Sequence, residues 1–567
     1  MQRGPDDEGR HREPGLHLGA RRLRVIDLEG GHQPMANETG TVWVALNGEI
    51  YNYRELREEL ISKGHRFASR CDTEVLAHLY EQEGEDGVQR LRGMFAFALW
   101  DRNLETLYLV RDGLGIKPLY FYQGPLRGSE GRPTFSFASE LPALMAALPS
   151  CTIHAPAIAE YLRLLYVPGP ETVLEGVEEV RPGELVRFRR GQLTRRRFFH
   201  LARLARPTTM ATTRSQESEL AEQFITCLKH TVNAHLISDV PLGMFLSGGL
   251  DSGAILAMMR ALSTKPIRTF SIGYEAEADR SYDETEAARL LARHFQADHT
   301  EQRLRPDAVT LLPKIVAAMG EPFADSSAIP TYLVSQVARQ AVTVALSGIG
   351  GDELFGGYPR YLGIRAARPY TRLPRRLRAW VAGWLPPLLR EREVSQDHRG
   401  RFRRFFRHGH EPIADQYLRW MRFLPAEWED RALTTELRRK ARSETLDRRY
   451  RHMFEDWPSA DPADRAMALD LQTYLPDDLL RMGDRLSMAH SLELRVPFCD
   501  QELLTMALAI PAHIRLRGWR LKGFMRRALH PLLPREILGR PKFGFQVPVA
   551  RWLREDLREM VRDLLTE

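Results

Sequence analysis

The segment FLSGGLDSG, residues 245–253, constrains the fold of this chain more than any other stretch. An apolar run ends at Leu246, and a second apolar run of helical character begins near Ala254. Between them, Gly248 and Gly249 allow a sharp turn and let the backbone approach a ligand without a Cβ in the way. Backbone amides at the start of the following helix then face an anion. The segment predicts a phosphate-binding turn between a strand and a helix.

The polar side chains of this turn refine the prediction. Ser247 and Ser252 add hydroxyl donors for phosphate oxygens. Asp251 would be repelled by bare phosphate, so we interpret it as a ligand of Mg²⁺, which prefers oxygen donors. The turn has neither the Gly-Lys-Ser/Thr ending of a Walker loop nor the dinucleotide fingerprint. A glycine-rich turn without a ligand is the alternative interpretation.

A second loop of the same kind follows in ALSGIGGDELFGGY, residues 345–358, where Asp352 and Glu353 come just after an apolar strand and a Ser-Gly pair. From about residue 217, strands alternate with helices, which predicts a doubly wound parallel sheet. Ligands collect at the carboxyl ends of strands in such a sheet. We therefore expect the two loops to meet over one nucleotide, with Asp251 and Asp352 on one Mg²⁺. The alternative for the acidic pair is a helix cap or a solvated surface.

The first part of the chain reads as alternating short strands and helices. TVWVALNGEI, residues 41–50, is apolar and β-branched and is expected to turn at Asn47-Gly48. Residues 94–101 and 106–112 are strand-like with a short polar turn between them, which predicts an antiparallel pair. We divide the chain into residues 1–145, a connecting segment at 146–216, and residues 217–567.

Composition excludes several classes of protein. Hydrophobic residues make up 43% and charged residues 27% of the chain, which excludes a mainly disordered protein. The chain has no run of ~18 apolar residues, and its opening MQRGPDDEGRHREPG has no apolar core, so neither a membrane span nor a secretory signal is predicted. The four cysteines lack metal-ligand spacing, and we predict buried apolar thiols in a reducing cytoplasm. They are Cys71, Cys151, Cys227 and Cys499.

The charge balance argues against a nucleic-acid partner. A net charge of +7 is small for 567 residues, and eight lysines stand against 73 arginines. We interpret the arginine excess as a general compositional habit and predict neither a nucleic-acid nor a membrane partner. The arginine-rich stretch 365–410 is interpreted as helices with aromatic residues in the core and arginines in solvent. A helix on a membrane surface or on nucleic acid is the alternative for that stretch.

The motifs together resemble a known family. SGGLDS resembles the fingerprint of the ATP pyrophosphatases, and the ordered set looks like the bacterial glutamine-hydrolysing asparagine synthetases over nearly the whole chain. The set is NGEIYNYRELREEL, LRGMFAFALWD, RDGLGIKPLYF, FASE, LSGGLDS, FSIGY, LSGIGGDELFGGYPRY, SLELRVPFCD and RPKFGF. The resemblance implies an α/β multi-domain protein. An αββα N-terminal-nucleophile glutaminase domain, incomplete here, would precede a doubly wound ATP-pyrophosphatase domain with a helical C-terminal part, and an ammonia tunnel would join them.

The resemblance also implies a reaction and its residues. Aspartate would be amidated with ATP and Mg²⁺ through β-aspartyl-AMP, releasing AMP and pyrophosphate, with glutamine or ammonia as the nitrogen source. The adenylate would contact Leu246, Ile272, Ser347 and Gly348, and pyrophosphate would contact Ser247, Gly248, Gly249 and Ser252. Lys542 would stabilise the leaving pyrophosphate, Lys522 would be a second phosphate lysine, and Asp251 and Asp352 would hold the metal. Asp484, Arg485, Glu493 and Arg495 lie in a segment that resembles the synthetase core, as structural ion pairs or as catalytic groups.

The glutamine pocket of the family is matched without its nucleophile. Arg22 would bind the glutamine carboxylate, Asn47 and Gly48 would form the oxyanion hole, and Asp72, assisted by Glu49, would bind the α-amine. The family uses an N-terminal cysteine with its free α-amine as base, but residue 2 here is Gln, and none of the four cysteines has that place. We therefore expect no glutamine hydrolysis and the use of free ammonia. A misassigned or fragmentary start is one explanation, and an ammonia-dependent or degenerate enzyme is the other.

The carboxylate acceptor stays open on sequence alone. Ile349 occupies the position where asparagine-forming members of the family carry a glutamate after LSG. An amidotransferase acting on another carboxylate, such as a uronic acid, a peptide or a natural product, is therefore an alternative, and so is a non-catalytic relative. Residues 321–332 would line the acceptor pocket, with Asp325 and Ser326 as candidates. Whether the protein is a homodimer is also open.

Overall fold

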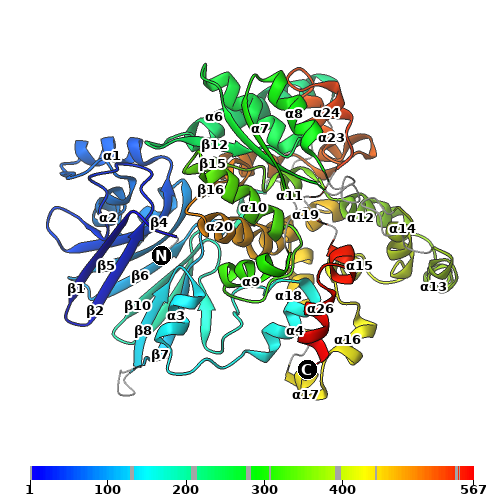
Figure 1. Ribbon diagram of the computed structural model, residues 1–567, viewed down its shortest axis with the longest axis horizontal. Helices are drawn as coiled ribbons and strands as arrows, with labels where there is room; N and C mark the ends of the chain where they lie inside the picture. The colour runs from blue at the N-terminus through cyan, green and yellow to red at the C-terminus, as the bar shows by residue number, and fades with distance from the viewer. Residues whose placement is uncertain are drawn as a thin grey trace.

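The computed structural model describes residues 3–127, 133–205, 213–275, 283–304, 308–389, 398–440, 444–542, 544, 547 and 549–566. The elements of the first half are β1 (Asp7–Glu13), β2 (Leu16–Arg22), β3 (Met35–Ala36), β4 (Val42–Ile50), α1 (Tyr53–Ser62), α2 (Asp72–Glu83), β5 (Gly93–Asp101), β6 (Thr106–Arg111), β7 (Tyr120–Pro125), β8 (Pro133–Ala138), α3 (Leu141–Ala147), α4 (Ala155–Leu164), β9 (Val177–Glu179), β10 (Glu184–Arg189), β11 (Gln192–Arg197) and α5 (Leu201–Leu204). Figure 1 shows this half at the left of the molecule, in blue and cyan.

The first half is built around an antiparallel sheet in the order β11-β10-β6-β5-β4-β3. Successive side chains of β5 point to opposite faces, as the period of a strand requires. Phe95 and Phe97 pack on the face covered by α1 and α2. Ala96 and Ala98 pack on the other face, against residues of β2 and β7. The predicted antiparallel pairing of residues 94–101 with 106–112 is confirmed by the register of β5 and β6.

Two features of this sheet differ from the sequence analysis. The expected turn at Asn47-Gly48 is wrong, because β4 continues to Ile50 and stays paired with β5. Gly48 has φ 134°, and a Cβ there would lie 2.0 Å from the carbonyl oxygen of Met94, so this glycine permits a close backbone approach. In addition, β10 and β11 fall within the segment 146–216 and extend the sheet, since β10 pairs with β6.

The second half contains a parallel sheet in the order β14-β13-β12-β15-β16. Its elements are α6 (Arg214–His235), β12 (Leu242–Phe245), α7 (Leu250–Leu262), β13 (Arg268–Tyr274), α8 (Thr285–His294), β14 (Asp298–Leu304), α9 (Ala308–Met319), α10 (Ala328–Arg339), β15 (Val344–Leu346), α11 (Gly351–Phe355), α20 (Arg481–Met488) and β16 (Glu493–Arg495). From β12 the chain adds β13 and β14 on one side and then β15 and β16 on the other. The topological switch point therefore lies between β12 and β15, and the predicted doubly wound sheet is confirmed.

Helices cover both faces of the parallel sheet. Helices α6 and α7 share a core with Met244 of β12 and Leu346 of β15. Helices α9, α10 and α20 share a separate core with Phe270 and Ile272 of β13. The sheet is thus buried between two helical layers, which fits the nearly continuous apolar sequence of its strands.

The remainder of the second half is helical. It comprises α12 (Pro359–Tyr370), α13 (Arg375–Trp384), α14 (His398–Arg407), α15 (Ile413–Met421), α16 (Ala426–Ala432), α17 (Thr435–Lys440), α18 (Glu444–Glu455), α19 (Pro462–Gln472), α21 (Gln501–Ala509), α22 (Ala512–Arg515), α23 (Gly523–Ala528), α24 (Arg535–Gly539), α25 (Val549–Arg554) and α26 (Arg558–Thr566). In Figure 1, α12 to α14 lie to the right of the sheet, α15 to α18 and α26 lie below it, and α23 and α24 lie at the top beside α8. Within residues 365–410, Tyr370 packs against Phe405, but Trp380 and Trp384 of α13 are exposed and stack on each other. The prediction that the aromatic residues of this stretch lie in the core therefore fails for α13. No helix in the described ranges is long and apolar enough to cross a bilayer.

The two halves are joined through α20, which lies at their junction (Figure 1). Asp484 accepts hydrogen bonds from Arg3 Nη2 at 2.6 Å and from Lys117 Nζ at 3.0 Å. Arg481 Nη2 lies 2.8 Å from Glu179 Oε2, and Arg485 Nη2 donates to Tyr120 Oη at 2.6 Å. All three α20 side chains are buried. Asp484 therefore forms ion pairs of the kind that the structural interpretation expects.

Candidate active site and glutamine pocket

The two predicted phosphate loops meet at the switch point of the parallel sheet. A Cβ added to Gly348 would lie 2.9 Å from Asp251 Cβ, and one added to Gly351 would lie 2.6 Å from Asp251 Oδ1. Only glycines let the second loop approach the first so closely. Strand β15 ends at Leu346, and this loop begins at Ser347. The Ser347 amide donates a hydrogen bond to the Arg495 carbonyl oxygen at 2.8 Å. The carboxyl ends of β12 and β15 thus form one site.

The turn after β12 has the geometry of an anion cradle. Gly248 has φ +70°, and a Cβ there would lie 2.6 Å from atoms of Ala287 and Ala288 in α8. Gly249 is the N-cap of α7 and has no side chain with which to cap the first amides of that helix. The hydroxyl oxygens of Ser247 and Ser252 lie 3.2 Å apart beside it. Helix amides and hydroxyls therefore converge where a phosphate group would bind.

Two lysines neutralise the two acidic residues of the site. Lys522 Nζ forms ion pairs with Asp251 Oδ2 and, at 2.5 Å, with Asp352 Oδ1. Lys542 Nζ forms an ion pair with Asp352 Oδ2. Burial opposes ionisation of Asp352, but Lys522 and Lys542 outweigh it and lower the pKa of this carboxyl. Burial likewise opposes charge on Lys542, and the carboxylates of Asp352 and Asp251 raise its pKa above the ordinary value. Ionised groups of both signs are held together here.

The acidic pair fits a divalent cation. Asp251 Oδ1 is buried and has no hydrogen-bond partner among the described residues. The carboxylates of Asp251 and Asp352 share Lys522, so they face one region from two loops. Carboxylate oxygens of this kind are the donors that Mg²⁺ takes in nucleotide sites. The residues present therefore suit the metal that the sequence analysis expected.

Leu246 and Ile272 are the other two residues predicted to contact the adenylate. Leu246 is buried in the core shared with α7, and its amide donates to the Phe270 carbonyl oxygen at 2.8 Å. Ile272 is buried in the core on the opposite face of the sheet. The two side chains thus lie in the cores on the two faces of the sheet.

Sequence reasoning missed two charged residues at this site. Arg540 Nη1 donates to the Gly248 carbonyl oxygen at 3.4 Å and lies 3.6 Å from Glu284 Oε1. Burial raises the pKa of the Glu284 carboxyl to about 7, although Arg540 opposes the shift. The only signal for Arg540 was its place two residues before Lys542 in GRPKFGF. Glu284 had no signal of its own.

A second site lies in the first half, where a cavity of about 100 Å³ is lined by every residue predicted for glutamine: Arg22, Asn47, Gly48, Glu49 and Asp72. Arg22 Nη1, Asn47 Nδ2 and Glu49 Oε2 are buried without hydrogen-bond partners among the described residues. The second half also contributes to the wall through Met488 and Glu493. The cavity therefore offers unused donors and acceptors to a polar ligand.

The acidic residues of this cavity have altered proton affinity. Burial and the Glu493 carboxylate raise the pKa of Glu49 well above its ordinary value. Burial also raises the pKa of Asp72, whose Oδ2 accepts a hydrogen bond from the Ile50 amide at 2.9 Å. The two buried carboxyls thus line one polar cavity together with the cationic Arg22.

Cys71 is the cysteine that borders this cavity. Its thiol donates to Asp72 Oδ1 at 3.3 Å, and burial, together with the Asp72 charge, raises its pKa. The predicted burial of Cys71 in an apolar core is confirmed, since it packs with residues of α1 and α2, and its thiol also contacts Asp72 and Thr73. All four cysteines are free thiols; Cys499 is also buried, but the predicted burial is wrong for Cys151, which is exposed, and for Cys227, which is half-buried. A thiol held protonated is a poor nucleophile.

Comparison with known proteins agrees with the two sites. The family model described as Asparagine synthase matches residues 223–567, and the one described as Glutamine amidotransferase domain matches residues 1–199. The chain is 34% identical to asparagine synthetase [glutamine-hydrolyzing] 1 of Bacillus subtilis, over 100% of this chain and 85% of that protein. It is 30% identical to asparagine synthetase [glutamine-hydrolyzing] 3 of the same bacterium, over 95% and 81%, and 26% identical to amidase chry2 of Gibberella zeae, over 100% and 86%. The chain belongs to the glutamine-hydrolysing asparagine synthetase family of carbon–nitrogen ligases.

Proposed function

We propose that this protein amidates a carboxylate at the expense of ATP, with aspartate as the acceptor and asparagine as the product. The observation that carries the proposal is the group formed by Asp251, Asp352, Lys522 and Lys542 where β12 and β15 end. This group suits a nucleoside triphosphate. Its two carboxylates can hold a metal, its two ammonium groups can bind phosphates, and the N-terminus of α7 lies beside them.

The first step forms β-aspartyl-AMP. The side-chain carboxylate of aspartate attacks the α-phosphorus of ATP, the bond between the α-phosphorus and the bridging oxygen breaks, and pyrophosphate leaves with the electron pair. Mg²⁺ held by Asp251 and Asp352 would neutralise phosphate charge. Lys522 and Lys542 exchange their carboxylate partners for phosphate oxygens and stabilise the leaving group. The amides of α7 and the hydroxyls of Ser247 and Ser252 hold the pyrophosphate.

The second step transfers nitrogen. The lone pair of ammonia attacks the acyl carbon, AMP leaves with the bonding pair, and one proton is released to give the amide. We propose that free ammonia supplies the nitrogen for this 567-residue chain. The support is Cys71, the cysteine at the glutamine cavity, whose thiol is kept protonated by burial. The cavity can bind glutamine through Arg22 without cleaving it.

A second candidate function is amidation of a different carboxylate. Ile349 supports this second candidate. Its side chain packs against both of the apolar cores that flank the parallel sheet. Its Cδ1 would lie 3.1 Å from a Cβ added to Gly483. An apolar group at that place can neither accept a proton from ammonia nor bind the aspartate α-amine. A relative named as an amidase among the similar proteins is in keeping with a broader range of acceptors.

The deciding experiment measures pyrophosphate release by the full chain with ATP and Mg²⁺. Aspartate is combined with ammonium chloride or with glutamine, and asparagine and glutamate are measured separately. Pyrophosphate and asparagine with ammonium, without glutamate from glutamine, is the expected result. Glutamate formed in step with asparagine would contradict the ammonia proposal and leave the synthetase proposal standing. ATP binding without pyrophosphate release on aspartate, but with release on another carboxylate, would favour the second candidate.

A further inference from the structure

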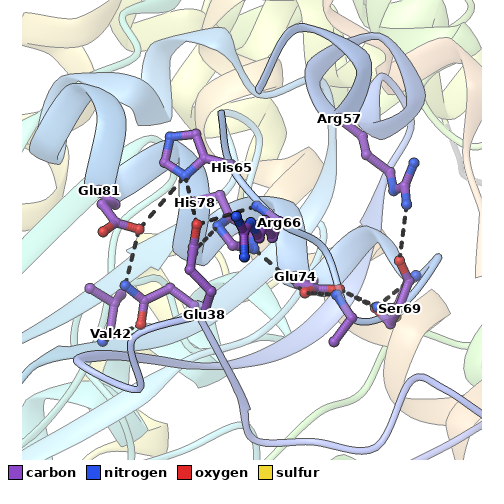
Figure 2. Close-up of polar contacts among 12 residues, drawn as sticks. Glu38, Val42, Arg57, His65, Arg66, Ser69, Glu74, His78 and Glu81 are labelled. Atoms are coloured by element: carbon purple, nitrogen blue, oxygen red, sulfur yellow. Dashed lines mark hydrogen bonds and ion pairs between the residues drawn. The ribbon is translucent and has the colours of Figure 1, made fainter. Parts of the chain in front are cut away.

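Two histidines and two glutamates converge on the helical side of the first half, away from both sites described above. Glu38 lies between β3 and β4, His65 lies between α1 and α2, and His78 and Glu81 lie on α2. Their ligand atoms, one from each residue, all lie within 4.8 Å of one another. Figure 2 shows the four side chains pointing toward a common region from three separate segments.

Both imidazoles present the same nitrogen to this region. His65 Nδ1 lies 3.7 Å from Glu38 Oε1 and 3.7 Å from Glu81 Oε2, and His78 Nδ1 lies 2.9 Å from Glu38 Oε2. The other ring nitrogen of each histidine faces an outer acceptor: His65 Nε2 lies 3.2 Å from Gln82 Oε1. His78 Nε2 lies 3.5 Å from Glu74 Oε1 (Figure 2). With its proton on Nε2 toward the outer oxygen, each imidazole offers the Nδ1 lone pair to a metal, and the outer oxygen is the supporting partner.

The outer partner of His78 is itself held in place. Glu74 accepts hydrogen bonds from the amides of Ala68 and Ser69, both at 2.7 Å. The ring of Phe67 packs against His78 at a centroid distance of 4.2 Å. A ligand whose rotamer is fixed by packing and by a second hydrogen bond loses little entropy when it binds a metal.

His78 supplies an independent sign that a ligand belongs here. Its side chain is fully buried, and its Nδ1 has no hydrogen-bond partner among the described residues, although Glu38 Oε2 lies only 2.9 Å away. A neutral Nδ1 lone pair facing a carboxylate oxygen is unfavourable unless a cation lies between them. Glu38 Oε1 accepts a hydrogen bond from the Arg66 amide at 3.2 Å, and Glu81 Oε2 accepts one from Asn37 Nδ2 at 3.0 Å, so both carboxylates are held in place. A divalent cation between them and His78 would satisfy the buried Nδ1.

The spacing suits a small transition metal. Bonds of roughly 2.0–2.2 Å in a tetrahedron place neighbouring ligand atoms roughly 3.3–3.6 Å apart. The ligand distances of 2.9 and 3.7 Å lie on either side of this range. The side chain of His65 is 10% exposed, whereas Glu38 and Glu81 are 29% and 34% exposed, so an ion can enter from solvent. Two imidazoles with two carboxylates favour Zn²⁺ over Mg²⁺ or Ca²⁺, which prefer oxygen ligands alone.

We propose that Glu38, His65, His78 and Glu81 form a structural Zn²⁺ site. The ion would join the β3–β4 loop, the α1–α2 loop and the body of α2. Helix α2 begins at Asp72, which lines the glutamine cavity. The metal therefore fixes the helix that carries one wall of the cavity without touching the ligand in it.

Zinc binding is tested on the full chain after removal of metals with EDTA. Zn²⁺ is titrated in competition with a chromophoric chelator, and the expected result is one tightly bound ion per chain. Co²⁺ then serves as a spectroscopic probe. Nitrogen and oxygen ligands give visible d–d bands without the thiolate-to-cobalt charge-transfer band that a cysteine site would show.

The variants are His65→Gln and Glu81→Gln, made separately because both positions are partly exposed and are expected to fold. Each is expected to weaken Zn²⁺ binding by about tenfold or more and to abolish the cobalt bands. The matched control is His230→Gln, whose imidazole is exposed and lies 2.9 Å from Glu502 Oε2. This control removes a histidine–carboxylate pair elsewhere and is expected to bind Zn²⁺ like the unaltered protein. Zn²⁺ is also expected to raise the melting temperature of the unaltered chain and of the control only.

Three results would overturn the proposal. The first is the absence of a stoichiometric ion in the unaltered chain. The second is a Zn²⁺ affinity that neither His65→Gln nor Glu81→Gln changes. The third is a thiolate charge-transfer band in the cobalt protein, which would place the ion on a cysteine.

Discussion

Lys522 and Lys542 form ion pairs with the carboxylates of Asp251 and Asp352, the two residues proposed to hold a divalent cation. In the proposed reaction, a metal on Asp251 and Asp352 would release the two lysines to phosphate oxygens. The exchange keeps every buried charge partnered throughout. The two lysines are therefore expected to differ from ordinary surface lysines, and Lys522 is itself buried.

Replacing Lys542 tests this exchange directly. Lys542→Ala is expected to lower the rate of pyrophosphate release by about 10²–10³-fold, because one cation facing the developing charge is lost. The rate is measured at saturating ATP and acceptor. Lys63→Ala is the control, since Lys63 Nζ forms an exposed pair with Glu59 on α1 at 2.7 Å. A rate within twofold of the unaltered enzyme for Lys542→Ala would remove this residue from the chemistry.

His235 makes folding stability depend on pH. Burial lowers the pKa of this imidazole from 6.5 to about 4, and its Nδ1 lies 2.8 Å from the Thr231 carbonyl oxygen. Above pH 6.5 the group is neutral in both the folded and unfolded states. Between pH 6.5 and pH 4 only the unfolded state takes up the proton, so stability falls with decreasing pH. The loss reaches about 3 kcal/mol near pH 4.

This prediction is checked by urea unfolding of the unaltered chain and of His235→Gln at several pH values between 4 and 8. Other groups titrate in the same window, so the difference between the two proteins is the relevant quantity. The variant is expected to be less sensitive to pH between 6.5 and 4. Parallel curves for the two proteins would show that His235 does not contribute.

At the scale of elements, the turn between β12 and α7 depends on one glycine. Gly248→Ala would place a Cβ 2.6 Å from Ala287 and Ala288 at φ +70°. The positive φ alone costs about 1–3 kcal/mol for a residue with a side chain, and the contact with α8 adds to it. We expect a lower free energy of unfolding and weaker ATP binding, measured by denaturation and calorimetry.

Gly191→Ala is the matched control for the strain. Gly191 has φ +80° in the turn between β10 and β11, and a Cβ there would meet nothing within 4 Å. This variant carries the backbone cost without a clash. Equal destabilisation by the two changes, with ATP binding intact in both, would contradict the role given to the close approach at Gly248.

Elements that depend on interactions between residues close in sequence could be predicted from the sequence. Features that depend on residues far apart in sequence could not. The strand–turn–helix around residues 245–253 and the pairing of 94–101 with 106–112 follow from short-range patterns, and both are present. The turn expected at Asn47-Gly48 is absent because the partner strand β5, far along the chain, keeps β4 straight. Glu284 and Arg540 could not be found for the same reason, since only the folded chain brings them to Gly248.

At the scale of the whole molecule, a few buried charges hold the halves together. Asp484 is buried and bonded to Arg3 and Lys117 from the first half. Asp484→Asn is expected to cost about 3–5 kcal/mol, because it leaves cations without a full counter-charge. Thermal unfolding should also lose cooperativity between the halves, as followed by calorimetry.

The control for this change is Asp415→Asn, which removes a partly exposed ion pair with Arg451 on the helical part. Pairs of that kind contribute about 0–1 kcal/mol. A similar small effect for Asp484→Asn would show that the buried charges do not join the halves. The sequence alone left this ion-pair role beside a catalytic one, because it could not show which first-half residues Asp484 meets.

The participation of Met488 and Glu493 in the wall of the glutamine cavity has a consequence for recombination between relatives. If the first half is fused to the second half of a relative, its cavity lacks part of its wall unless that second half supplies equivalent residues. A cut between residues 199 and 223 separates the two matched regions in the sequence. The cavity nevertheless needs residues from both regions. A workable chimaera would have to carry α20 and β16 along with the first half. The structural unit that encloses this cavity is therefore larger than residues 1–199.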